Sequence, residues 1–156
     1  MRREVLDKVG YMDESLSYVM DFDYWLSAGI HCRFAYLPEK IAALRIHSGA
    51  KSVQKIRNFA DELVHIYEKL FQNPDLPDQI CGIKRKAMRN IYFRAADCAF
   101  WGDDIGAARH YALTAWSHAP LRPSKMLIPL AFGQLGKRIL HQKYGNPYLL
   151  GTDKPA

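Results

Sequence analysis

The side chains best suited to acid–base or phosphate chemistry gather in the N-terminal part of the sequence. Asp21 and Asp23 stand at the start of a segment with a helical pattern, and Arg45, His47 and Lys51 follow a stretch with strand-like patterns. Backbone N–H groups and the helix dipole keep a carboxylate at a helix N-terminus ionised, which suits a general base at neutral pH. The residue types predict one base near a group of positive charges.

Short helices and two extended segments are expected to position these residues. A helix over 2–9 should end at Gly10, and a second, over 21–28, should stop at Gly29. Residues 32–37 alternate between apolar and other side chains, residues 41–47 form a compact apolar run, and Pro38 lies between them. This pattern predicts a short β-hairpin.

Helical periodicity dominates the rest of the chain. Apolar residues at three- and four-residue steps predict helices over 53–72, 79–101 and 124–142, and a further helix capped by Asp103 or Asp104. The expected fold class is therefore an α/β fragment, mainly α, with a short β-hairpin followed by helical hairpins. We assign 1–53 to a small α/β part, 54–143 to a helical extension and 144–156 to an irregular tail.

The order of three motifs in residues 1–52 supplies a further clue. The chain reads Arg2-Arg3-Glu4-Val5-Leu6-Asp7-Lys8-Val9-Gly10, then Met12-Asp13-Glu14-Ser15-Leu16, then Met20-Asp21-Phe22-Asp23-Tyr24-Trp25-Leu26, and finally Ala43-Leu44-Arg45-Ile46-His47. In this order the motifs resemble the acceptor-side, C-terminal half of family 2 glycosyltransferases of the GT-A fold. The resemblance covers residues 1–55 well and the helical remainder only loosely.

The resemblance implies an inverting transferase that moves a sugar from a nucleoside diphosphate to an acceptor hydroxyl. Asp21 stands where the family places the general base, although Met20 replaces the usual glutamate before it. The family's nucleotide-binding half, with its Asp-x-Asp motif and divalent metal (Mn or Mg), is expected to precede Met1. We therefore expect this chain alone to be inactive and to bind no metal tightly.

The neighbouring residues have supporting roles. Helical spacing turns Asp23 away from Asp21, so it would support the site by holding a backbone amide or an arginine. Trp25 and Tyr24 are the aromatic side chains that could stack on the acceptor sugar. The alternatives are that Asp21 is a plain N-cap and that the tryptophan belongs to the core.

His47 would contact the metal or the diphosphate, and Arg45 and Lys51 would add positive charge where the leaving group departs. A histidine on a surface loop is the alternative. A second alternative takes Asp21-Phe22-Asp23 as the metal-binding Asp-x-Asp itself, which the helical context that follows disfavours.

Charge and composition limit the possible partners. Residues 1–50 hold 6 Lys/Arg and 7 Asp/Glu, whereas residues 51–156 hold 16 and 9. For the basic C-terminal part, packing onto the core is the favoured interpretation, and peripheral contact with a membrane surface is the alternative. No recognisable nucleic-acid-binding motif is present, so no nucleic-acid partner is expected. Three cysteines without metal-ligand spacing indicate a reducing, cytoplasmic setting.

The main competing hypothesis is a non-catalytic helical module for protein interaction. Residues 95–120 resemble one tetratricopeptide-like helix pair, and a single pair cannot form a solenoid. The donor sugar, the acceptor and the linkage are not indicated by the sequence.

Overall fold

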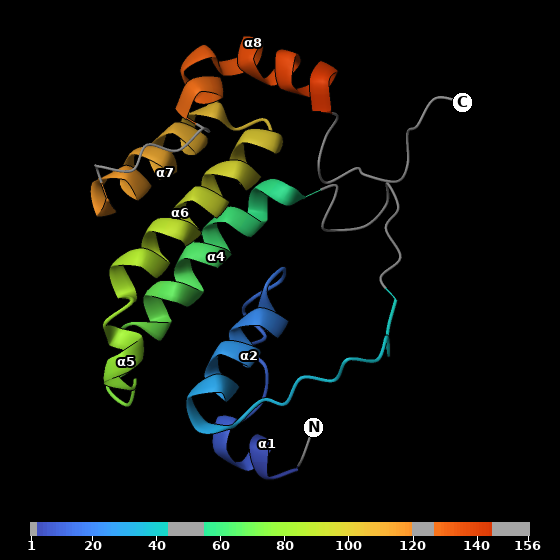
Figure 1. Ribbon diagram of the computed structural model, residues 1–156, viewed down its shortest axis with the longest axis vertical. Coiled ribbons are helices and arrows are strands. Elements are labelled where there is room, and N and C mark those ends of the chain that lie inside the picture. Colours follow the sequence, from blue (N-terminus) through green and yellow to red (C-terminus); the bar gives the residue numbers. More distant parts are fainter. Residues whose placement is uncertain (1–2, 44–54, 120–126, 145–156) are drawn as a thin grey trace.

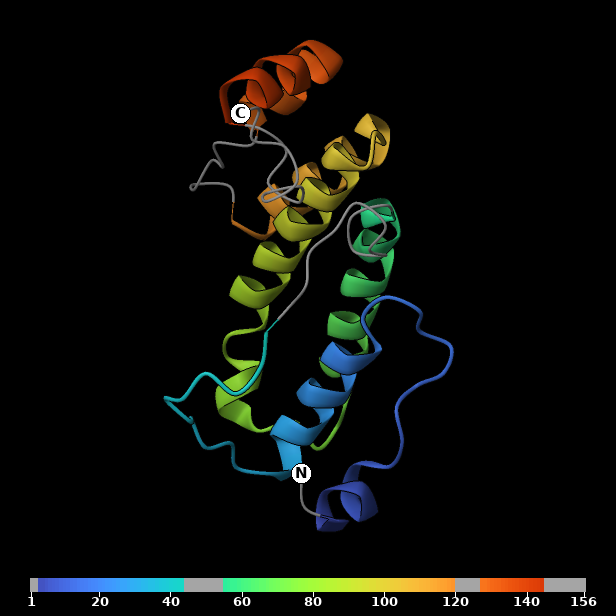
Figure 2. The same cartoon turned by 90° about the vertical axis from the view of Figure 1, so that its right-hand side faces the viewer.

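The computed structural model describes residues 3–43, 55–119 and 127–144, and over these residues the protein is all-helical (Figure 1). Two short elements open the chain, α1 (Arg3–Val9) and α2 (Met20–His31). The remaining helices are α4 (Ile56–Leu70), α5 (Asp78–Cys81), α6 (Lys84–Trp101), α7 (Ile105–His118) and α8 (Leu127–Tyr144). In both views α1 lies at one end of the molecule and α8 at the other (Figure 2).

The expected β-hairpin is wrong, and with it the α/β fold class. Residues 33–43 form no strand, and the hydrogen bonds of a β-ladder are missing from the described residues. Side chains of the alternating pattern stay exposed, Phe34 at 62% and Tyr36 at 89%. Strands need a partner and a packed face to be stable, and this segment has neither within the described chain. Part of the expected second strand, residues 44–47, lies outside the described residues.

The core is built by α4, α6 and α7. Helix α6 packs between α4 and α7, as the ribbon shows (Figure 1). Small side chains with 0–1% exposure line these contacts and let the helices approach closely: Ala60, Ala95, Ala99, Ala108 and Ala112. Larger side chains fill the space around them, above all Phe100 and Ile66, each 1% exposed.

The turn between α6 and α7 is fastened to α4. Asp104 is the N-cap of α7, where it accepts from the Ala107 amide at 2.9 Å, and it also pairs with Arg57 of α4 at 2.8 Å. A Cβ at Gly102 would lie within 2.9 Å of the Arg57 backbone, so only glycine fits this crossing. Of the two aspartates expected to cap α7, Asp104 does so.

Several helix boundaries differ from the expectation. The end of α1 agrees with the expectation: Val9 is its last residue, and Gly10 follows with φ +80°, a left-handed conformation that glycine adopts readily. Helix α2 continues past Gly29 to His31, and the helix expected over 79–101 is divided into α5 and α6 around Gly82.

Helix α8 packs beside α6 and α7 and is interrupted at Gly133, which has φ 56° and ψ −127°. Its Lys137, on the basic surface considered for membrane contact, donates to the Trp101 carbonyl at 3.1 Å and pairs with Asp103 at 2.6 Å. None of the described helices combines the length and apolar character needed to cross a membrane.

Two tyrosines fasten α4 to the hairpin of α6 and α7. Tyr92 donates its hydroxyl to Glu68 at 2.8 Å, and Tyr111 donates to Asp61. Burial, followed by the adjacent carboxylate, raises the pKa of each tyrosine from 10.0 to about 12. The stabilisation is therefore complete below pH about 10 and is lost as the pH rises towards about 12.

When the pH is raised from about 10 to about 12, the free energy of unfolding should fall less for the variant Tyr92→Phe than for the wild type, because the variant has no hydroxyl to ionise. Urea unfolding at each pH, followed by circular dichroism, measures this difference. The exposed Tyr36→Phe is the matched control, and it should follow the wild type. Equal pH profiles for Tyr92→Phe and the wild type would contradict the assigned role.

Candidate functional site

The start of α2 is positioned by a carboxylate from another helix. Glu62 of α4 accepts from the backbone amides of Ser17, Tyr18 and Val19, at 3.0, 2.8 and 3.1 Å. Helix α2 has no side-chain cap of its own at Val19, and Glu62 instead binds the three consecutive backbone amides that lead into the helix. The orientation of α2, and of every candidate residue on it, therefore depends on α4.

Asp21 lies in the first turn of α2, not at its N-cap. The helix begins at Met20, and the Asp21 carboxylate accepts from the amide of Phe22 at 2.8 Å. The side chain is exposed, and no ion pair with it occurs among the described residues. The plain N-cap alternative is therefore wrong, and Asp21 presents a carboxylate to solvent at the positive end of the helix dipole.

Asp23 points the other way and is held by a lysine. Its side chain is buried, and it pairs with Lys69 of α4 at 3.0 Å. Lys69 also pairs with Asp13 at 3.1 Å. The partner is thus a lysine, where an arginine or a backbone amide was expected, and the contact ties α2 and the preceding loop to α4.

The pKa values follow from this arrangement. Burial opposes the charge on Lys69, but its bonds to Asp23 and Asp13 prevail and raise its pKa. A hydrogen bond from the Ser15 hydroxyl, followed by one from Lys69, lowers the pKa of Asp13 to about 2. The Asp13 carboxylate therefore stabilises the fold above pH about 4, and this contribution is lost as the pH falls towards 2.

The variant Lys69→Gln is expected to lower the free energy of unfolding by about 1–3 kcal/mol, because it leaves the buried Asp23 carboxylate without its charged donor. Urea unfolding at neutral pH measures the loss. Lys86→Gln, which changes an exposed lysine of α6, is the control and should change stability by less than about 0.5 kcal/mol. Equal stability of the two variants would show that the Asp23 pair is dispensable.

The two aromatic candidates occupy different environments. Tyr24 is 3% exposed and belongs to the interior, so it offers no face to a ligand. Trp25 is 47% exposed, which excludes the core alternative. Trp25 follows Asp21 by one helical turn, and residues four apart lie on the same helix face. The carboxylate and the indole are therefore neighbours on the surface of α2.

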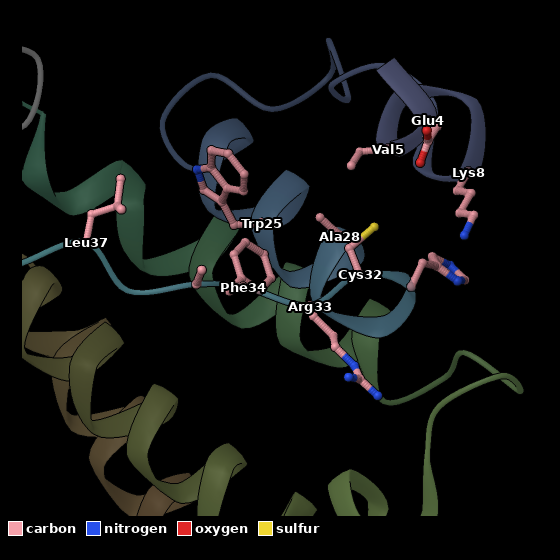
Figure 3. A pocket seen from close by; sticks show the side chains of 11 residues that line it. Glu4, Val5, Lys8, Trp25, Ala28, Cys32, Arg33, Phe34 and Leu37 are labelled. Carbon is pink, nitrogen blue, oxygen red and sulfur yellow. The ribbon is translucent and has the colours of Figure 1, made fainter. Parts of the chain in front are cut away.

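A cavity of about 850 Å³ opens beside Trp25, between α1, α2 and residues 32–37 (Figure 3). Phe34 meets Trp25 edge to face, with ring centroids 5.9 Å apart. Lys8 of α1 and Arg33 add cations to the lining. Sequence reasoning missed Lys8, Arg33 and Phe34, because the pattern of residues 32–37 was interpreted as a strand and α1 was given no part in the site.

The structure does not describe the three remaining candidate residues. Arg45, His47 and Lys51 lie outside the described residues, so the expected contact with a metal or a diphosphate stays a prediction. Within the described ranges, no group of three or more His, Cys, Asp or Glu side chains could hold a metal ion. Asp21 and Asp23 face different surroundings, which disfavours the interpretation of Asp21-Phe22-Asp23 as a metal-binding pair.

Comparison with protein-family models, curated proteins and solved structures finds no match to this chain.

Proposed function

We propose that this chain is the acceptor-side part of an inverting family 2 glycosyltransferase, with Asp21 as the general base. The observation that carries the proposal is the exposed Asp21 carboxylate, which lies one helical turn from Trp25. Trp25 in turn lines a cavity that is large enough for a sugar. The order of motifs in residues 1–52 supports it.

In the proposed reaction the acceptor hydroxyl binds within hydrogen-bond reach of Asp21. The carboxylate accepts the hydroxyl proton as the oxygen attacks the anomeric carbon, and the nucleoside diphosphate leaves from the opposite face. The Asp21 carboxylate accepts from the backbone amide of Phe22 and lies at the positive end of the helix dipole. The buried pair of Asp23 and Lys69 holds α2 in place and does not touch the substrate.

The described residues do not fit a divalent metal, because Asp21 stands alone and Asp23 is occupied by Lys69. No step of the proposed reaction is therefore assigned to a metal at this site. Recognition of the sugar nucleotide falls to a nucleotide-binding part that these residues do not supply.

A helical module for protein interaction is the second candidate. Leu113 and Trp116 of α7 are 60% and 42% exposed and lie one turn apart, as in a helix face that binds another protein. This candidate assigns no chemistry to Asp21, and it predicts no sugar transfer under any condition.

A binding and transfer assay distinguishes the two. Isothermal titration of the chain alone with uridine and guanosine diphosphate sugars and manganese should show no site tighter than about millimolar. Joined to a nucleotide-binding part of the same enzyme family, the chain should support sugar transfer. A saturable micromolar site in the chain alone would contradict the proposed division of labour, and absence of transfer by the joined protein would favour the interaction module.

A further inference from the structure

The cavity between α1 and α2 has more positive than negative charge in its lining. Lys8 and Arg33 contribute a full positive charge each, His31 lies beside them, and Glu4 is the one acidic side chain among the lining residues. Lys8 and Arg33 form no ion pair within the described part of the chain. Lys8 and Arg33 outnumber Glu4 in the lining, and this excess of positive charge at the border of a cavity favours an anionic ligand.

The other side of the cavity is aromatic. Trp25 and Phe34 form an edge-to-face pair, and both remain substantially exposed, at 47% and 62%. Ala28 and Cys32 lie between this aromatic wall and the side chains of α1 (Figure 3). Exposed aromatic faces of this kind bind flat, partly apolar surfaces.

The volume of about 850 Å³ lies within the range of small-molecule sites. We infer that this cavity binds an anionic sugar, a hydroxylated ring that carries a phosphate or a carboxylate, as the acceptor of the transferase. The ring packs on Trp25, and the anionic group lies against Lys8 and Arg33. Since Trp25 is one turn from Asp21, a ring held there presents a hydroxyl towards the base. The role as acceptor site depends on the proposed function, but the binding itself does not.

Titration of the chain with four probes tests the inference: glucose 6-phosphate, glucuronate, glucose and inorganic phosphate. Calorimetry at low salt, together with tryptophan fluorescence, should show both anionic sugars binding at least about 10-fold more tightly than glucose or phosphate. Added salt should weaken this preference, because exposed charges are screened. Glucose measures the contribution of the sugar ring alone, and inorganic phosphate measures the contribution of the anionic group alone.

Variants locate the binding. Arg33→Gln and Lys8→Gln should each weaken both anionic sugars by about 5- to 10-fold and leave glucose unchanged. Trp25→Ala should weaken all three sugars. Lys86→Gln removes an exposed cation of α6 outside the cavity and should have no effect, and circular dichroism checks that each variant is folded.

Equal affinity for glucose and the anionic sugars would overturn the inference, as would no saturable binding or unchanged affinities in Arg33→Gln and Lys8→Gln. Asp21→Asn separates this inference from the proposed function, because Asp21 does not line the cavity. Loss of transfer in Asp21→Asn without any binding of anionic sugars would refute only the cavity assignment. Normal binding of anionic sugars with unaffected transfer in Asp21→Asn would refute only the catalytic assignment.

Discussion

Asp21→Asn should lower the turnover of sugar transfer by about 10²-fold or more, with little change in the affinity for the acceptor. The substitution keeps the size of the side chain but removes the group that accepts the hydroxyl proton, and general base catalysis contributes at least this factor. Steady-state transfer rates of the chain joined to a nucleotide-binding part give the measurement. Because the loss should fall on kcat, a change confined to KM would not fit a base.

The control for this variant is Asp78→Asn, which changes the aspartate in the first turn of α5. Both substitutions remove a negative charge near a helix N-terminus, at a cost of about 0.3–1 kcal/mol in stability. Asp78→Asn should retain full turnover. If Asp21→Asn also retained near-normal turnover, Asp21 would be a helix-stabilising residue without a role in the reaction.

Phe100→Ala should lower the free energy of unfolding by about 3–5 kcal/mol, the largest effect on stability expected for this protein. The ring is 1% exposed, belongs to the cluster between α4, α6 and α7, and meets Trp101 edge to face at 5.6 Å. Truncation leaves a cavity in this buried cluster, because the surrounding side chains relax only partially to fill it. Urea unfolding followed by circular dichroism measures the change.

Leu113→Ala is the matched control, because it truncates a side chain of α7 that is 60% exposed. Surface substitutions of this kind change stability by less than about 0.5 kcal/mol. A loss below about 1 kcal/mol for Phe100→Ala would show that the packing of α6 against its neighbours is looser than the structure indicates.

The helices could be predicted wherever the chain carries its own periodic signal. Ile56, Leu63 and Ile66 of α4, and Ile91, Ala95 and Cys98 of α6, repeat at helical spacing and are all buried. The same local reasoning failed at residues 32–37. Alternation of Cys32, Phe34 and Tyr36 is compatible with a strand, but backbone groups of a strand must pair with another strand. That requirement is tertiary, and no periodicity along one segment can reveal it.

The candidate site divides in the same way. The sequence by itself determined that Asp21 stands at the start of a helix and that Trp25 follows it by one turn, because both depend on spacing within one segment. Only the tertiary structure decided which carboxylate is free. Lys69, which follows Asp23 by 46 residues, forms an ion pair with the Asp23 carboxylate. Glu62, which follows Ser17 by 45 residues, accepts from the Ser17 amide and so helps to position α2. Such contacts depend on how α4 packs against α2, and the spacing of residues within either helix carries no information about it.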